Sequence, residues 1–297
     1  MTSPVAVVTD SAASLPPEVA RAWGIRVVPL QVIVDDVPHA EDASLGPQAV
    51  VEDLLAGKAV STSQPSPEAF VSAFEAAARA GATEVVAVLI SGKMSGTVNA
   101  AQAAAAMVEI PVHVVDSNTL AMATGFAAIA AAAVARADGT AHEVAAEASR
   151  VAESSLCVFT VDTLEYLQKG GRISPAVAAI GKVLSVRPVL AIVDGEVDLV
   201  ERVRTTVKAR HALVSRVEAH VASLGSPAVA VMALGDASQG EYGDDAARAI
   251  LERCPHLSSP VRSAVSAVLA VHTGPGALAA VVADIPRHVF ERTATPR

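Results

Sequence analysis

The sequence predicts an α/β protein of two domains: an N-terminal domain with a parallel sheet and flanking helices, and a C-terminal α/β domain with a mixed or antiparallel sheet. Three observations lead to this prediction. The length of 297 residues suits two domains of about 150 residues each. Short apolar runs alternate with helical patterns through the first half, which is typical of parallel βαβ units. In the second half, Asp194-Gly195 separates two apolar runs and favours an antiparallel hairpin.

The first half contains four predicted strands, which are short runs rich in valine and isoleucine: residues 5–9, 26–34, 84–90 and 112–115. The predicted helices lie at residues 16–23, 45–56, 66–80, 95–108, 119–137 and 140–155. Ser66-Pro67-Glu68 is a typical helix start, because serine caps free N–H groups and proline fits the first turn. This alternation of strands and helices places the strands in one parallel sheet.

Polar side chains follow three of these strands, at Asp10-Ser11, Ser91 to Ser95 and Asp116-Ser117. Ligands of open parallel sheets bind at the carboxyl ends of the strands. Because these ends meet at the same edge of the sheet, we expect a binding site there.

The pattern changes after Ser154. Predicted strands occupy residues 156–161, 190–193, 197–202, 228–234 and 261–271, and a long helix occupies residues 206–224. A tight hairpin at residues 194–195 joins antiparallel strands, so this half cannot form a purely parallel sheet. We therefore divide the chain into an N-terminal domain, residues 1–154, and a C-terminal domain, residues 155–297.

The composition excludes two classes of protein. Hydrophobic residues make up 52% of the chain and charged residues 18%, against about 25% charged in an ordinary soluble protein. This apolar content excludes a disordered chain. The net charge is −9 and only 3% of residues are aromatic, so the chain lacks both the basic surface and the stacking side chains of nucleic-acid-binding proteins.

Three features bear on the compartment. Cys157 and Cys254 lie outside any CxxC or zinc-type spacing, so we expect buried or half-buried thiols in a reducing compartment, the cytoplasm. Residues 1–15 contain no Lys or Arg, which does not fit a secretory signal. Residues 117–135 are 19 uncharged residues, but nine of them are alanine, which inserts poorly into membranes. We expect them to form a buried helix.

Familiar catalytic signatures do not fit the sequence. In Gly92-Lys93-Met94-Ser95-Gly96, the serine is one place too late for a nucleophile elbow. His142-Glu143 lacks the second histidine of a zinc protease motif. Gly274-Pro275-Gly276 only loosely resembles a dinucleotide-binding turn and lacks an acidic partner about 20 residues on. We expect neither a metal nor a nucleotide cofactor.

Three polar turns remain as candidate binding segments. Ser61, Thr62 and Ser63 are three consecutive hydroxyls, more than a helix cap needs. Ser95 precedes a predicted helix, where it could cap the N-terminus or mark an anion site; the sequence leaves both open. His272 follows the predicted strand 261–271 and precedes Gly274 and Gly276. A single histidine is more often structural, but glycines at a strand end allow a ligand to approach closely.

The motifs of these turns, in order, resemble those of the DegV family. They are Thr62-Ser63-Gln64-Pro65-Ser66, Ser95-Gly96-Thr97, Lys169-Gly170-Gly171-Arg172-Ile173-Ser174 and His272-Thr273-Gly274-Pro275-Gly276-Ala277-Leu278. The opening Val7-Val8-Thr9-Asp10-Ser11 and the segment Val115-Asp116-Ser117 match as well. The resemblance covers nearly the whole chain and implies one long-chain fatty acid, such as palmitate, held between two α/β domains.

The resemblance also implies roles for particular residues. Thr62, Ser95 and His272 would bind the carboxylate of the fatty acid. The loops that support this head-group site contain Ser63, Gly96, Thr97, Thr273 and Gly274. Arg172 and Arg204 match basic positions that face the kinase or the head group, although an ordinary solvated arginine is the alternative for each. A histidine beside a carboxylate should have a raised pKa in the complex.

The resemblance assigns no catalysis to this chain. A separate ATP-dependent fatty acid kinase subunit would phosphorylate the bound acid, and the carrier would then exchange acyl phosphate with phospholipid synthesis, with transient membrane contact. Two departures affect the pocket: Gly92 stands where the family often has a second serine, and Val98 stands where an aromatic residue is common. Two alternatives stay open: a lipid sensor, and a small hydrolase or phosphotransfer enzyme using Ser95, His272 and Asp10, with Asp116 beside them.

Overall fold

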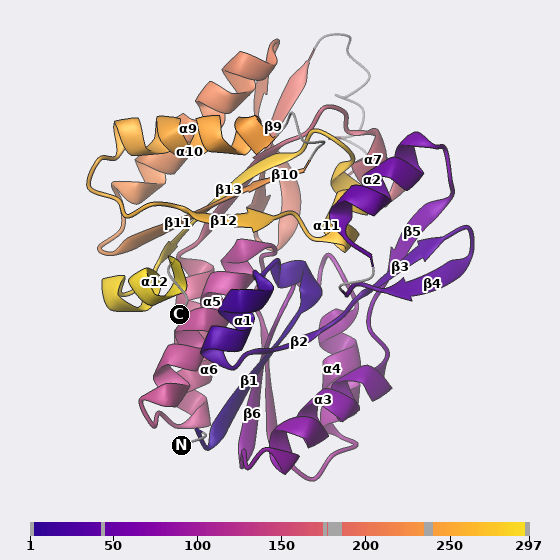
Figure 1. The fold of residues 1–297 in the computed structure, drawn as a ribbon, viewed down its shortest axis with the longest axis vertical. Coiled ribbons are helices and arrows are strands. Elements are labelled where there is room, and N and C mark those ends of the chain that lie inside the picture. The colour runs from indigo at the N-terminus through magenta and orange to yellow at the C-terminus, as the bar shows by residue number, and fades with distance from the viewer. Residues whose placement is uncertain (1–2, 43–44, 175–176, 178–185, 235–239, 295–297) are drawn as a thin grey trace.

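The computed structural model describes residues 3–42, 45–174, 177, 186–234 and 240–294. A four-stranded parallel sheet has the order β2 (Arg26–Val28), β1 (Val5–Asp10), β6 (Glu84–Leu89) and β7 (Val112–Asp116). A six-stranded sheet has the order β10 (Glu196–Val203), β9 (Arg187–Val193), β8 (Leu156–Thr160), β13 (Leu278–Asp284), β11 (Pro227–Ala233) and β12 (Val261–Ala264). The two sheets lie at opposite ends of an elongated molecule (Figure 1).

The four-stranded sheet is covered on both faces, which explains its continuous apolar strands. Val8, Val85 and Leu89 pack with the helices α3 (Pro67–Arg79) and α4 (Thr97–Ala105). The alternate residues Val7 and Val86 point to the opposite face, toward α5 (Met122–Arg136) and α6 (Ala141–Glu153). The parallel sheet with flanking helices is therefore confirmed.

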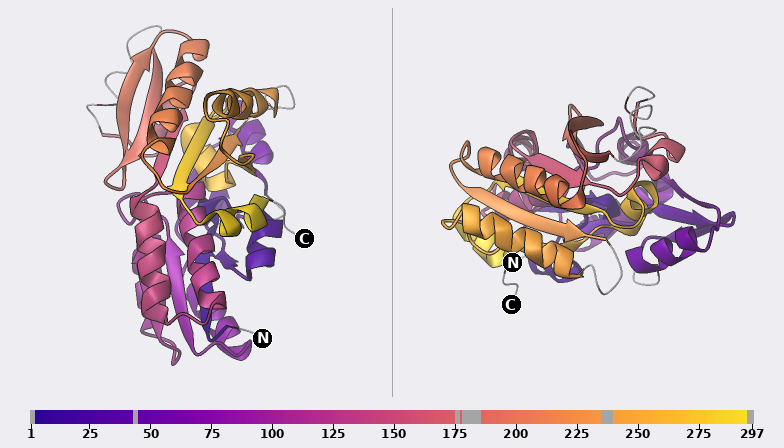
Figure 2. Two further views of the ribbon diagram at one scale, coloured as in Figure 1. Left: turned by 90° about the vertical axis from the view of Figure 1, so that its left-hand side faces the viewer. Right: turned by 90° about the horizontal axis from the view of Figure 1, so that it is seen from above.

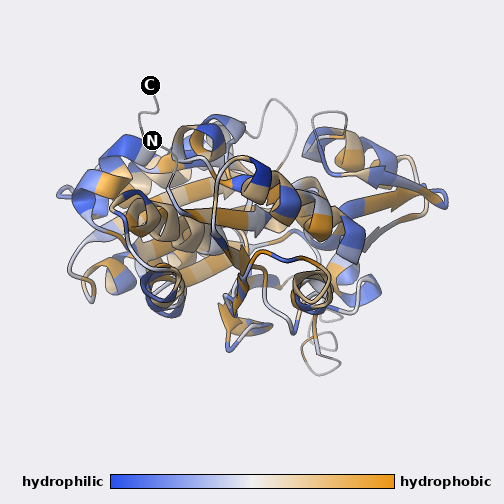
Figure 3. Cartoon of the chain, turned by 90° about the horizontal axis from the view of Figure 1, so that it is seen from below, coloured by the Kyte–Doolittle hydropathy of each residue, from blue (hydrophilic) through white to orange (hydrophobic). Residues whose placement is uncertain are grey.

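The six-stranded sheet is mixed, as predicted for the second half. Its neighbouring strands are antiparallel except β11 and β12, which are parallel. The helices α9 (Thr206–Val221) and α10 (Gly240–Arg253) cover one face of this sheet (Figure 2). Figure 3, which views the molecule from the opposite end, shows apolar strands in the middle and hydrophilic residues on the surrounding helices. The hairpin turn falls at Asp194-Gly195, where both residues have positive φ. The division between domains at residue 154 remains a prediction.

The helix α5 connects the two large sheets. Almost all of its residues are buried, and it contacts both β1 and β13. Figure 2 shows the α5–α6 pair beneath the six-stranded sheet. Alanine suits this position because its small side chain allows close approach of neighbouring backbones. The predicted buried helix is confirmed, and among the described residues no helix is both long and apolar enough to cross a membrane.

The single strand predicted for residues 26–34 is wrong. The segment forms two strands in different sheets: β2, and β3 (Gln31–Val34) in a small sheet ordered β4 (Val37–Ala40), β3 and β5 (Val60–Ser63). Pro29 separates them, because proline has no N–H for a sheet ladder. The N–H of Leu30 instead donates to Ser11 Oγ, 2.9 Å away. This small sheet was not predicted, and it places Thr62 in a strand rather than a turn.

The strand predicted for residues 261–271 is also wrong. Only Val261–Ala264 is a strand, and the helix α11 (Ala267–Thr273) follows. Ser266 caps this helix by accepting a hydrogen bond from the N–H of Leu269. A short apolar run does not distinguish a strand from a buried helix, so the sequence pattern was ambiguous here. His272 therefore lies in the last turn of a helix. The prediction for the cysteines is confirmed: both are free and buried.

Candidate functional site

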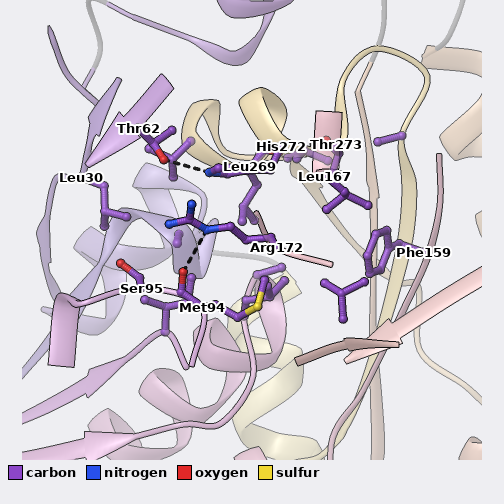
Figure 4. Close-up of a pocket in the computed structure, with 18 of the residues that line it drawn as sticks. Leu30, Thr62, Met94, Ser95, Phe159, Leu167, Arg172, Leu269, His272 and Thr273 are labelled. Carbon is purple, nitrogen blue, oxygen red and sulfur yellow. Dashed lines mark hydrogen bonds between the residues drawn. The ribbon is translucent and has the colours of Figure 1, made fainter. Parts of the chain in front are cut away.

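An apolar cavity lies where the three sheets meet. It encloses about 850 Å³, including a part that is open to solvent. Its apolar lining consists of Ala12, Leu30, Ile90, Met94, Leu120, Ala121, Cys157, Phe159, Leu167, Val197, Met232, Val265, Val268, Leu269, Ala277 and Ala279. Its polar lining consists of Thr62, Ser63, Gln64, Ser95, Arg172, His272 and Thr273. In Figure 4, Thr62 and Ser95 lie on the opposite side of the cavity from Leu167 and Phe159.

The six-stranded sheet supplies one apolar wall of this cavity. Ala279 on β13 pairs with Phe159 on β8 and with Met232 on β11. Residues directly opposite one another on neighbouring strands point to the same face, so these three side chains form one row. Cys157 lies two residues before Phe159 and shares that face. Burial raises the pKa of the Cys157 thiol to about 12, so it acts as an apolar wall residue.

The polar end depends on a hydrogen bond between Thr62 and His272. Thr62 Oγ1 and His272 Nε2 lie 2.8 Å apart, although the residues are 210 positions apart in the sequence. The small sheet carries Thr62, and α11 carries His272. Glu41 fixes the start of α11, because its Oε1 accepts from the N–H of Val268 at 3.0 Å while its Oε2 accepts from Ser11 Oγ at 2.5 Å.

The imidazole of His272 is neutral at pH 7. Burial lowers the pKa of His272 to about 4, and the positive charge of Arg172 acts in the same direction. Among the described residues, its Nδ1 atom has no hydrogen-bond partner and is shielded from solvent. A neutral imidazole carries one N–H; when this proton is on Nε2, it donates to Thr62 Oγ1 and leaves the Thr62 hydroxyl to donate to an anionic ligand.

Ser95 lies in the loop between β6 and α4. The N-cap position is Gly96, so the interpretation of Ser95 as the helix cap is wrong. Its Oγ instead forms a hydrogen bond with Thr97 Oγ1 at 2.8 Å. Since α4 has no side-chain cap, the N–H groups of its first turn are left for another acceptor. Gly96 lies against the side chain of Gln64, and only glycine fits there, because a Cβ at position 96 would lie 1.8 Å from Gln64 Oε1.

Arg172 reaches the site through a glycine turn. The helix α7 (Glu165–Lys169) ends in a Schellman motif: the N–H of Gly171 donates to Gln168 O and the N–H of Arg172 to Leu167 O. Gly171 has φ +68°, which glycine adopts without strain. The Arg172 Nε atom then donates to Met94 O at 3.2 Å (Figure 4). The reversal of the chain at Gly171 thus places the Arg172 guanidinium beside Met94 in the lining of the cavity.

The structure brings most of the sequence-predicted residues together. Thr62, Ser63, Ser95, Arg172, His272 and Thr273 all line the cavity. Three others lie just behind it: Thr97 bonds Ser95, Gly96 contacts Gln64, and Gly274 packs against the ring of Tyr166. Arg204 is exposed after the end of β10 and does not line the cavity, so its predicted role remains a prediction.

Sequence reasoning missed Glu41 and the apolar wall. Glu41 follows an exposed hairpin and matches no local motif that would predict a contact with Val268. The wall residues Phe159 and Met232 were predicted only as strand residues, and no strand was predicted at Ala279. A strand pattern shows that a residue is apolar, but which strands are neighbours, and in what register, is decided by tertiary pairing.

Among the described residues, no hydrogen bond joins Ser95, His272 and Asp10 to one another. Ser95 is bonded to Thr97, and His272 Nε2 to Thr62. The Asp10 carboxylate accepts from the N–H groups of Ala12 and Ile90, at 2.9 and 2.7 Å, and burial raises its pKa to about 7. These bonds join the ends of β1 and β6, so Asp10 has a structural role. Over the part of the chain that the structure describes, no three metal-ligating side chains gather.

Comparisons with known proteins agree with this architecture. A family model described as "Uncharacterised protein, DegV family" matches residues 4–284. A DegV domain-containing protein of Streptomyces coelicolor is 37% identical over 284 residues, which cover 96% of this chain and 100% of the relative.

Two solved structures are also similar. A structure from Thermus thermophilus, described as fatty acid binding of a DegV family protein, has 31% identity and a TM-score of 0.84, covering 95% of this chain and 99% of the other. DegV of Bacillus subtilis, described as a fatty acid binding protein, has 28% identity and a TM-score of 0.85, covering 95% and 100%. The family match spans nearly the whole chain and includes every segment of the site described above. The chain belongs to the DegV family.

Proposed function

We propose that this protein binds one long-chain fatty acid, such as palmitate, with its acyl tail in the cavity and its carboxylate beside Thr62, Ser95 and His272. The observation that carries the proposal is the segregation of the lining: hydroxyls and an imidazole gather at one side, and apolar side chains form the rest. A fatty acid has the same division between head and tail. The fatty-acid-binding relatives of similar structure support the same ligand class.

The tail supplies most of the binding free energy. Burying a tail of about 16 carbons at about 0.8 kcal/mol per CH₂ gives on the order of 12 kcal/mol before ordering costs. A hydrogen bond to a charged group contributes about 1.5–3 kcal/mol. The head-group residues therefore fix the position of the carboxyl group more than they fix the affinity.

The residues beside the proposed carboxylate position supply the hydrogen-bond donors that a buried carboxylate needs. With Nε2 protonated, His272 donates to Thr62 Oγ1, which leaves the hydroxyl hydrogens of Thr62 and Ser95 to donate to the carboxylate. The carboxylate would favour protonation of His272 and so raise its pKa from the low value of the ligand-free protein.

The protein then presents the carboxyl group to a separate ATP-dependent fatty acid kinase subunit and itself catalyses no reaction. In this proposal Arg172 and Arg204 face the kinase, and transient membrane contact allows exchange of acyl phosphate for phospholipid synthesis in the cytoplasm. The motifs shared with the DegV family support this role.

Mass spectrometry of organic extracts from the purified protein tests the ligand. We expect one co-purified fatty acid per chain. In a kinase-coupled assay, Thr62→Ala and Ser95→Ala should lower acyl-phosphate yield while Ser223→Ala, an exposed control in the turn after α9, should not. Equal yields from all three variants would contradict the site assignment. Ester hydrolysis by the protein alone would favour an enzyme instead.

The role of Arg172 has its own test. Arg172→Ala should weaken binding of the kinase subunit while lipid loading is retained. The reverse result, with loading lost and kinase binding intact, would reassign Arg172 to the lipid site.

A further inference from the structure

A second groove lies on the other side of the Thr62–His272 pair. It encloses about 1000 Å³ that are partly open to solvent, and its lining comes from residues 54–62, from α7 and from the end of α11. Three residues line both spaces: Thr62, Arg172 and His272. These side chains therefore lie at the boundary that the apolar cavity and the groove share.

The groove is basic. Among the described residues that line it, Lys58, Lys169 and Arg172 are cations and none is an acid. This contrasts with the chain as a whole, whose net charge is −9. Tyr166 and Ser61 add hydroxyl groups to the same lining. A lining with cations and hydroxyl donors suits a small anion with several oxygen acceptors.

The two lysines are available to such an anion. Lys58 pairs with Asp53 at 2.6 Å and Lys169 with Glu165 at 2.8 Å, but the lysine side chains are 44% and 70% exposed. Exposed pairs of this kind contribute at most about 1 kcal/mol, so a more highly charged partner can replace them. Neither Asp53 nor Glu165 lines the groove. When the two lysine side chains turn into the groove to bind an anion, no carboxylate therefore faces that anion.

At His272, the apolar cavity and the groove lie on either side of a single side chain. A Cβ on Gly170 would lie 2.2 Å from His272 Nδ1, so only a residue without a side chain fits there. Gly170 itself lines the groove, and Nδ1 has no hydrogen-bond partner among the described residues. One edge of the imidazole therefore carries Nε2, which is bonded to Thr62. The other edge carries Nδ1, which lies beside Gly170 at the groove.

We propose that this groove binds the phosphoryl group of a fatty acyl phosphate whose tail occupies the cavity. The inference rests on the proposed function and adds a site for its product. When the carboxylate oxygen attacks the terminal phosphorus of a nucleoside triphosphate, a carboxyl O–P bond forms and the nucleoside diphosphate leaves. The new phosphate adds negative charge beyond the carboxyl group, on the groove side of the shared residues Thr62 and His272, where Lys58, Lys169 and Arg172 lie.

Displacement of a fluorescent fatty acid by palmitate and by palmitoyl phosphate tests the groove. The double variant Lys58→Ala/Lys169→Ala should bind palmitoyl phosphate about tenfold more weakly, since two partly exposed charge contacts are lost. Its affinity for palmitate should stay within about twofold, because palmitate carries no group that reaches the lysines. Lys208→Ala, an exposed lysine on α9, is the matched control and should change neither affinity.

The other outcomes separate the two proposals. If wild type and double variant bind palmitoyl phosphate equally while palmitate binds normally, the groove is not a phosphate site. If the wild type binds neither lipid, the proposed function itself fails. Calorimetry with ATP alone distinguishes the source of the phosphate: lysine-dependent ATP binding without an acyl chain would make the groove a nucleotide site and overturn the inference.

Discussion

The two sides of the cavity are built in different ways. The apolar wall comes from neighbouring strands of one sheet, in which Phe159, Ala279 and Met232 form a row by register. The polar side joins β5, the loop before α4 and the end of α11, and its central contact links Thr62 with His272 across 210 positions. The wall therefore has many interchangeable contributors, whereas the polar side depends on single hydrogen bonds.

This difference separates affinity from positioning. Each wall residue removes a little apolar surface from water, so binding strength is the sum of many small contributions. Each polar residue instead has a distinct bond direction, which determines where the carboxyl group lies. Variants on the two sides should accordingly differ in what they change.

Filling the apolar wall should have the largest effect. Ala279→Phe places a ring in the cavity and displaces about four methylene groups of the tail, which at about 0.8 kcal/mol each lowers palmitate affinity about 200-fold. Binding is measured by displacement of a fluorescent fatty acid, with thermal unfolding to check the fold. Ala222→Phe, at an exposed position after α9, is the control. Unchanged affinity in a folded Ala279→Phe protein would place the tail elsewhere.

Removing one polar contact should have a smaller effect on affinity. Thr62→Val keeps the shape of the side chain but loses the hydroxyl, and one hydrogen bond to a charge is worth about 1.5–3 kcal/mol, so palmitate affinity should fall about tenfold. Acyl-phosphate yield at saturating lipid should fall as well, because the carboxyl group is mispositioned. A full acyl-phosphate yield at saturating lipid would mean that Thr62 contributes to affinity and not to the position of the carboxyl group.

The pKa of His272 sharpens the comparison further. Its value of about 4 in the ligand-free protein should rise when palmitate is bound, which NMR titration of the imidazole measures directly. In the ligand-free protein, the unfolded chain takes up this proton near pH 6.5 and the folded chain near pH 4. The free energy of unfolding should therefore fall as the pH is lowered through this range. An identical His272 titration with and without palmitate would exclude contact with the carboxylate.

The smallest effect is expected at Glu41, which holds α11 from behind the polar side. Burial raises the pKa of Glu41, so its charge is costly, and Glu41→Gln keeps one acceptor for the N–H of Val268. Denaturant unfolding should change by about 1 kcal/mol or less, since a lost hydrogen bond is offset by a lost buried charge. Glu109→Gln, on the surface, is the control. A large loss of stability would show that the ionised carboxylate is needed.

Most regular elements could be predicted because their signals are local. Ser66 caps α3 as expected, and the Asp194-Gly195 turn forms the predicted hairpin. The failures came where a local pattern fits two structures. The apolar run after Ser266 fits a strand or a short buried helix, and the run containing Pro29 was divided between two sheets.

For the site, motif resemblance identified Thr62, Ser95 and His272, and the structure places all three on one cavity. The sequence by itself determined which segments carry hydroxyls or glycines and, where the local pattern fits only one structure, which segments are helical or extended, because these properties depend on neighbours within a few residues. Only the tertiary structure decided that β8, β13 and β11 lie side by side, that Glu41 holds α11, and that a basic groove adjoins the cavity. Those features depend on contacts between segments distant in the chain, whose pairing is set by the packing of the whole molecule.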